Sequence, residues 1–133
     1  MKKLLGIDYG SKRVGVAISD ENNQFGLPLT VIQNTFAASS DLAHEIQKLA
    51  KGYDINEIVL GESKNYKGED NTIMAKSLEL KKEMEGCGYL VHFEPEFMTS
   101  ANAERFQGKN DMSDASAAAL ILQSFLDKRR NSA

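Results

Sequence analysis

Short runs of hydrophobic residues, broken by polar turns, fill the first quarter of the chain, a pattern typical of strands. Residues 3–7 and 14–18 are mostly aliphatic, and a polar turn separates them. A third run, residues 26–32, contains Pro28, which cannot donate a hydrogen bond to a neighbouring strand. The pattern predicts three consecutive antiparallel strands, with the third at an edge of the sheet.

The apolar spacing becomes helical after Ser39 and Ser40, which are residue types that cap helices. A hydrophobic stripe follows them at Leu42, Ile46, Leu49, Ala50 and Tyr53. Helical spacing returns from residue 73 and ends near Gly86, and a short helix is expected at about residues 99–106. The last predicted helix runs from about Ser113 to Lys128 and has a broad apolar face.

Strand-like runs at residues 57–60 and 89–93 separate the predicted helices. The order is therefore β-β-β-α-β-α-β-α, in which consecutive strands favour antiparallel pairing and helix-separated strands favour parallel pairing. We predict an α/β fold, a mixed five-stranded sheet flanked by helices. Residues 1–130 are expected to form a single domain, with residues 131–133 as a frayed tail.

Composition narrows the class of protein. The single cysteine, Cys87, cannot form an intramolecular disulfide, which suits the cytoplasm. Gly6 and Asp8 interrupt the opening apolar stretch before it reaches the length of a signal peptide, and no run approaches the roughly 18 apolar residues of a membrane helix. The formal net charge of −3 does not indicate a nucleic-acid binder, so any such activity must come from a local site.

Acidic residues stand at three places where a hydrolytic site could form. Asp8 ends the first strand, Glu94 and Glu96 follow the fifth, and Asp111 and Asp114 lie at the start of the last helix. Structural roles also explain each one singly: an Asx turn for Asp8, a solvated edge for the glutamates, and the helix dipole for the other aspartates. Spacing alone does not choose between the two glutamates or between the two helix aspartates.

Three of these acids together point to metal chemistry. Ligands gather at the carboxyl ends of parallel strands, where Asp8 and Glu96 stand, and the last helix can bring Asp114 beside them. Three carboxylates, with no cysteine or histidine at metal-ligand spacing, suit Mg²⁺ or Mn²⁺ and disfavour zinc. Two such ions about 3.5–4 Å apart would activate water and stabilise the leaving oxygen. The predicted reaction is hydrolysis of a phosphodiester bond.

The segment LGIDYGSKRVGVAIS, residues 5–19, resembles the opening signature of the YqgF/RuvX family. That family comprises Holliday junction resolvases, also described as pre-16S rRNA processing nucleases, with a ribonuclease-H-like fold. Further segments agree with its motifs: Ile58–Gly61 followed by Asn65 and Gly68; Glu96 followed by Met98–Ser100; and the helix from Asp114 to Leu126. The resemblance covers nearly the whole chain.

Asp8, Glu96 and Asp114 fall on the family's three acidic positions, so the resemblance implies that they are the catalytic metal ligands. It thereby selects Glu96 over Glu94 and Asp114 over Asp111. The implied cofactor is Mg²⁺ or Mn²⁺, and the implied partner is nucleic acid, either pre-rRNA or branched DNA. We expect a cytoplasmic protein without membrane contact, acting as a monomer or a weak homodimer.

Basic and amide side chains near these acids are the predicted substrate contacts: Lys12, Arg13, Lys64, Asn65 and Lys67. The cations among them would also be ordinary as solvated surface charges. The chain departs from the family at Pro95 and Phe97, where an Asp and an Arg usually flank the glutamate. One basic phosphate contact is therefore missing beside Glu96.

Other functions remain open at this point. A nucleic-acid-binding module without efficient hydrolysis would fit the altered residues Pro95 and Phe97 and the acidic net charge. An ATPase of the actin or sugar-kinase type would use Asp8 and Gly10 in a phosphate loop, but its site lies between two such domains, and this chain has the length of one. Metal-dependent cleavage by the purified protein would separate a nuclease from a binding module.

Overall fold

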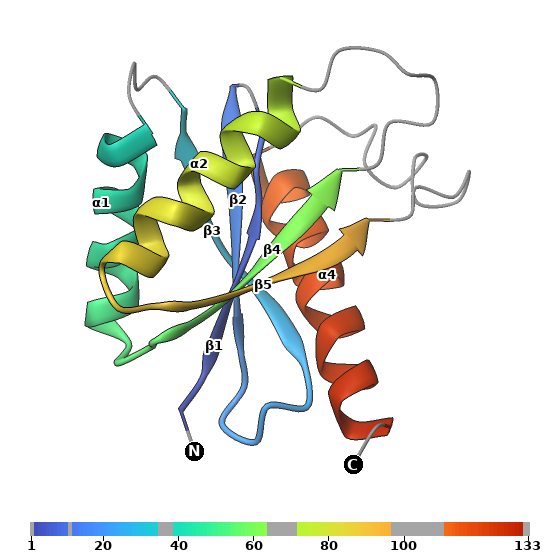
Figure 1. Ribbon diagram of the computed structural model, residues 1–133. Helices are drawn as coiled ribbons and strands as arrows, with labels where there is room; N and C mark the ends of the chain where they lie inside the picture. The colour runs from blue at the N-terminus through green and yellow to red at the C-terminus, as the bar shows by residue number, and fades with distance from the viewer. Residues whose placement is uncertain (1, 11, 35–38, 64–71, 97–110, 132–133) are drawn as a thin grey trace.

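The computed structural model describes residues 2–10, 12–34, 39–63, 72–96 and 111–131 (Figure 1). Its elements follow the predicted order: β1 (Leu4–Asp8), β2 (Arg13–Ser19), β3 (Gly26–Gln33), α1 (Ser39–Gly52), β4 (Glu57–Ser63), α2 (Thr72–Gly86), β5 (Leu90–Glu96) and α4 (Asp111–Asn131). The short helix expected at about residues 99–106 lies outside the described residues. Helix α4 continues through Asn131, one residue into the expected tail.

The strands form one five-stranded sheet in the order β3-β2-β1-β4-β5. Strand β2 pairs antiparallel with both β1 and β3, whereas β4 pairs parallel with β1 and with β5. The mixed sheet predicted from the sequence is confirmed. Pro28 lies in edge strand β3, as expected, and the register shifts beside it, so that Val16 pairs with Thr30 and Ala17 with Pro28.

Of the described helices, α1 and α2 cover one face of the sheet and α4 covers the other (Figure 1). Successive residues of β1 alternate between the two layers, as in any strand. Leu5 and Ile7 pack in the cluster that contains residues of α1 and α2, and Leu4 packs in the cluster that contains residues of α4. The alternation places Asp8, the last residue of β1, on the α4 face.

Helix α4 lies very close to the sheet because glycines and alanines line the contact. A β carbon on Gly26 would stand 2.6 Å from the main-chain oxygen of Ala119, and the amide of Gly26 donates a 3.0 Å hydrogen bond to the Gln123 side chain. Ala115, Ala118 and Leu122 are buried in the same contact between α4 and the sheet, called the seam below. The predicted apolar face of the last helix is thus the face that covers the sheet.

Several elements extend beyond the hydrophobic runs that predicted them. Strand β4 continues from the expected Leu60 to Ser63, and β5 continues through Pro95 to Glu96, because Gly61–Ser63 pairs with Glu94–Glu96. Pairing with a neighbouring strand lengthens both strands into polar sequence. Among the described residues, the helices are too short or too polar to cross a membrane.

Candidate metal centre

Two of the predicted acids flank the same glycine, Gly15. Asp8 ends central strand β1 and is the register partner of Gly15 in β2. Asp114 lies in the first turn of α4, and its main-chain carbonyl lies over Gly15, 1.9 Å from where a β carbon of that residue would be. The glycine leaves the space in which the start of α4 approaches the end of β1. The fold therefore brings Asp8 and Asp114 to the same end of the sheet, on the α4 face.

Asp114 has an unusual polar environment. The Nε atom of Arg13 lies 2.7 Å from its Oδ2 atom, which forms an ion pair. The Oδ2 atom is nevertheless buried and accepts no hydrogen bond from the described residues, so the ion pair with Arg13 is the polar contact that the structure gives it among them. A buried carboxylate oxygen without a hydrogen bond is costly unless something else binds it. A hard divalent cation fits such an oxygen.

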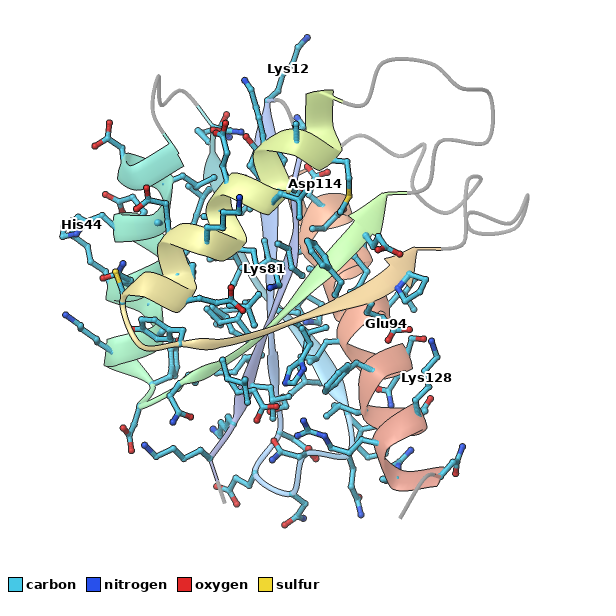
Figure 2. The ribbon with its side chains drawn as sticks, in the orientation of Figure 1. Lys12, His44, Lys81, Glu94, Asp114 and Lys128 are labelled. Carbon is cyan, nitrogen blue, oxygen red and sulfur yellow. The ribbon has the colours of Figure 1, made fainter. Side chains whose placement is uncertain are left out.

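Glu94 is buried, with 3% of its surface exposed, so the expectation of a solvated edge is wrong for this residue. It accepts hydrogen bonds from Ser124 Oγ at 2.8 Å and Lys128 Nζ at 2.6 Å, both on α4. Figure 2 shows Glu94 and Lys128 near one another, well along α4 from Asp114. The cause is tertiary: α4 covers this face of β5, although β5 is an edge strand.

Position 96 lies two residues beyond Glu94, at the last residue of β5. It ends β5 opposite Ser63 of β4, at the carboxyl end of the parallel part of the sheet. The Glu96 side chain lies outside the described part of the structure. Among the described side chains, no group of three or more His, Cys, Asp or Glu residues could hold a metal ion. Two of the three predicted ligands, Asp8 and Asp114, have described side chains.

The predicted substrate contacts fall into two groups. Lys12 is exposed in the turn between β1 and β2, and its side chain extends away from the sheet (Figure 2). Arg13 follows it but turns toward Asp114 and is 38% exposed. Lys64, Asn65 and Lys67 lie outside the described residues. The two adjacent cations therefore have different surroundings, although the sequence predicts the same role, a substrate contact, for both.

Asn34 supports this turn and was not among the predicted site residues. Its side-chain amide donates a 2.8 Å hydrogen bond to the Gly10 carbonyl, and its main-chain amide donates one of 2.8 Å to the Lys12 carbonyl. These bonds tie the turn after Asp8 to the end of β3. An asparagine just after a strand is a common turn residue, so the sequence carries no signal that would have singled it out.

A second polar cluster lies at the amino end of β4, the opposite end of that strand from the carboxylates. Glu57, its first residue, is bonded to His92 Nε2 at 2.7 Å and accepts a hydrogen bond from Arg129 of α4. The His92 ring and the Arg129 guanidinium both contact Phe125. Burial by itself would raise the pKa of Glu57, but the bonds and charges of Arg129 and His92 outweigh it and lower the pKa. This cluster joins β4, β5 and α4.

The model of one protein family, described as RuvX, Holliday junction resolvase, matches residues 2–128. The chain belongs to the RuvX family. The match spans every described strand and nearly all of α4. Membership confirms the resemblance drawn from the motifs around Asp8, Glu96 and Asp114, and with it the expectation of an enzyme that hydrolyses phosphodiester bonds.

Relatives match nearly the whole length of this chain, and the matches cover nearly all of their own. A protein of Lactobacillus acidophilus is 34% identical over 139 residues, covering 96% of this chain and 98% of its own. One of Caldanaerobacter subterraneus is 33% identical over 140 residues, covering 98% and 99%. Both carry the name "Putative pre-16S rRNA nuclease".

Solved structures show the fold. The structure of Thermus thermophilus RuvC in complex with a Holliday junction substrate has a TM-score of 0.63 at 12% identity and covers 99% of this chain and 98% of its own. The fowlpox virus resolvase, in complex with Holliday junction DNA, has a TM-score of 0.57 at 11% identity and covers 96% and 98%. The prediction of a ribonuclease-H-like fold is confirmed.

Proposed function

We propose that this protein is a divalent-metal-dependent nuclease that cleaves structured nucleic acid and uses Asp8, Glu96 and Asp114 as metal ligands. The observation that carries the proposal is that Asp8 and Asp114 both flank Gly15, and that one Asp114 oxygen is buried without a hydrogen bond from the described residues. Glu96 ends β5 opposite Ser63 of the parallel strand β4. Membership of the RuvX family supports the same reaction.

Each element has a defined part in this site. Strand β1 and helix α4 supply Asp8 and Asp114, and Gly15 sets how closely they approach. The bonds of Glu94 to α4 hold the strand that leads to Glu96. When bound, Mg²⁺ or Mn²⁺ would activate the attacking water and stabilise the leaving oxygen. The protein's contribution is to hold its carboxylates at one end of the sheet and to orient a phosphate beside them.

The substrate we propose is nucleic acid, either the end of pre-16S rRNA or a four-way DNA junction. The names of relatives refer to pre-16S rRNA, and the description of the family refers to the Holliday junction, a four-way DNA junction. Because the chain carries a net charge of −3, the phosphates must be contacted by basic side chains gathered at one site. We assign these contacts to Lys12, Arg13, Lys64, Asn65 and Lys67. A cytoplasmic monomer suffices to trim an RNA end, whereas paired junction cuts require a homodimer.

A cleavage assay on the purified protein tests the proposal. Pre-16S rRNA fragments and four-way DNA junctions are incubated with Mg²⁺ or Mn²⁺, and with EDTA as the blank. Asp8→Asn keeps the side-chain shape but removes a charge that binds metal, so it should abolish cleavage. Asp54→Asn is the matched control, since Asp54 has a side chain 88% exposed, remote from the site in β1 and α4.

The same assay addresses a second function. Pro95 lies in β5 directly before Glu96, where the family usually has an acidic residue, which favours a binding module that has lost hydrolysis. Metal-independent binding of both substrates without cleavage would establish that alternative and exclude the nuclease. Cleavage by the wild type that Asp8→Asn leaves intact would show that the proposed ligands are wrong.

A further inference from the structure

Arg13 pairs with a residue that the proposed function assigns to the metal. Its Nε atom is 2.7 Å from Asp114 Oδ2, and the two side chains are 38% and 28% exposed. Arg13 shares the α4 face of β2 with Gly15, two residues further along the strand. Its neighbour Lys12 extends to solvent (Figure 2). Of these two adjacent cations, Arg13 is the one that reaches Asp114.

The pair is close but poorly aligned. Arginine binds a carboxylate best through two parallel N–H···O bonds, which add both strength and direction. Here the Nε atom of Arg13 is 2.7 Å from Asp114 Oδ2, yet this oxygen accepts no well-aligned hydrogen bond from the described part of the chain. Ion pairs between partly exposed groups contribute little free energy. A stronger cation can therefore replace Arg13 on this oxygen at small cost.

A divalent ion bound to Asp114 would compete with Arg13 in two ways. It would take the same carboxylate charge, and its own charge would repel the guanidinium at such short range. Arg13 is the first residue of β2 and directly follows Lys12, which is exposed in the turn. Once released from Asp114, the Arg13 side chain would therefore lie beside a second exposed cation. Two adjacent free cations form a local site for phosphate in a chain whose net charge is −3.

We propose that Arg13 is a positioning residue that exchanges partners: it pairs with Asp114 in the absence of a divalent cation, and cation binding releases it to the phosphate backbone of the substrate. The inference rests on the proposed function, since it requires a metal ion at Asp114. Because such coupling is reciprocal, metal raises the affinity for nucleic acid and nucleic acid raises the affinity for metal, both through Arg13.

The first experiment measures Mn²⁺ binding to the full chain by titration calorimetry, without nucleic acid. Arg13→Gln should bind Mn²⁺ about two- to fivefold tighter than the wild type, because no ion pair has to break. Lys12→Gln, which removes the same charge one residue away, should bind as the wild type does. Equal or weaker binding by Arg13→Gln would overturn the inference and leave the proposed function standing. A wild type that binds no Mn²⁺ would overturn both.

The second experiment measures binding of a four-way DNA junction in EDTA at several salt concentrations. Asp114→Asn should release Arg13 without metal, so the slope of log affinity against log salt should steepen by about 0.9. The double variant Arg13→Gln/Asp114→Asn should lose this gain. Asp127→Asn is the control, because Asp127 pairs with Arg130 far along α4. An unchanged slope in a folded Asp114→Asn protein would contradict the exchange; should that variant not fold, the calorimetry of Arg13→Gln decides alone.

Discussion

The backbone of Gly15 lies against the main-chain carbonyl of Asp114, with no room between them for a β carbon. Gly15 is also the register partner of Asp8. One contact between β2 and α4 therefore sets how closely a carboxylate of the central strand approaches a carboxylate of the last helix. Packing in the seam and geometry of the proposed metal centre are the same feature of this fold.

Gly15→Ala should displace the start of α4 and thereby weaken the metal centre. The added carbon would lie 1.9 Å from the Asp114 oxygen, so the helix must move, at a cost of about 1–3 kcal/mol. Urea unfolding and Mn²⁺ titration should both show the loss. Gly52→Ala is the matched control, since nothing lies within 4 Å of its added carbon. Wild-type stability and metal affinity in Gly15→Ala would contradict this account of the seam.

Divalent metal should stabilise the wild-type protein against heat. A ligand that binds only the folded state at about 100 times its dissociation constant adds about 2.7 kcal/mol, which raises the Tm by several degrees. Asp8→Asn should lose most of that shift, and Asp54→Asn should keep it. The measurement is a melting curve in Mg²⁺ or Mn²⁺ against EDTA. Equal shifts in both variants would place the bound metal elsewhere.

Glu94 and Lys128 should respond unequally to mutation because their burial differs. The Glu94 side chain is 4% exposed, whereas that of Lys128 is 58% exposed. Lys128→Gln leaves a buried carboxylate without its charge partner and should cost about 1–3 kcal/mol. Glu94→Gln leaves only a lysine that can turn to water, so it should cost less. In urea unfolding, the double variant Glu94→Gln/Lys128→Gln should therefore be more stable than Lys128→Gln alone. A double variant that is no more stable than Lys128→Gln would refute this prediction.

Acid should weaken the Glu57 cluster. Burial favours a raised pKa for Glu57, but Arg129 and His92 bond its charged form and bring the pKa below its ordinary value of 4.5. A carboxyl whose pKa is lowered by folding stabilises the protein above its unfolded pKa, and that contribution disappears as the pH falls through the folded value. Glu57→Gln should therefore be less stable than the wild type at pH 7, and the difference should shrink below about pH 4.5.

Urea unfolding at several pH values tests this prediction. Glu79→Gln on α2 serves as the control, because Glu79 is exposed and the same change there removes a charge at the surface. The control should follow the wild-type profile throughout the acid range. A constant stability difference between Glu57→Gln and the wild type from neutral pH into acid would contradict the assignment.

The sequence was sufficient for the order of the described elements and for the family, and the short helix expected at about residues 99–106 stays a prediction. Apolar spacing distinguished strands from helices, and Pro28 placed β3 at an edge, because these features depend on the conformation of a few neighbouring residues. The motifs around Asp8, Glu96 and Asp114 indicated the RuvX family, which the family match confirms. The predicted roles of Lys64, Asn65 and Lys67 stay predictions.

Only the tertiary structure decided how α4 lies on the sheet. It buried Glu94, which sequence reasoning had placed at a solvated edge, and it joined Gly26 to Gln123 across 97 positions of the chain. It also turned Arg13 toward Asp114 while leaving Lys12 in solvent. Local propensity contains no term for such contacts, because they form between residues that are neighbours only after the chain has folded and small side chains have let the helix approach the strands.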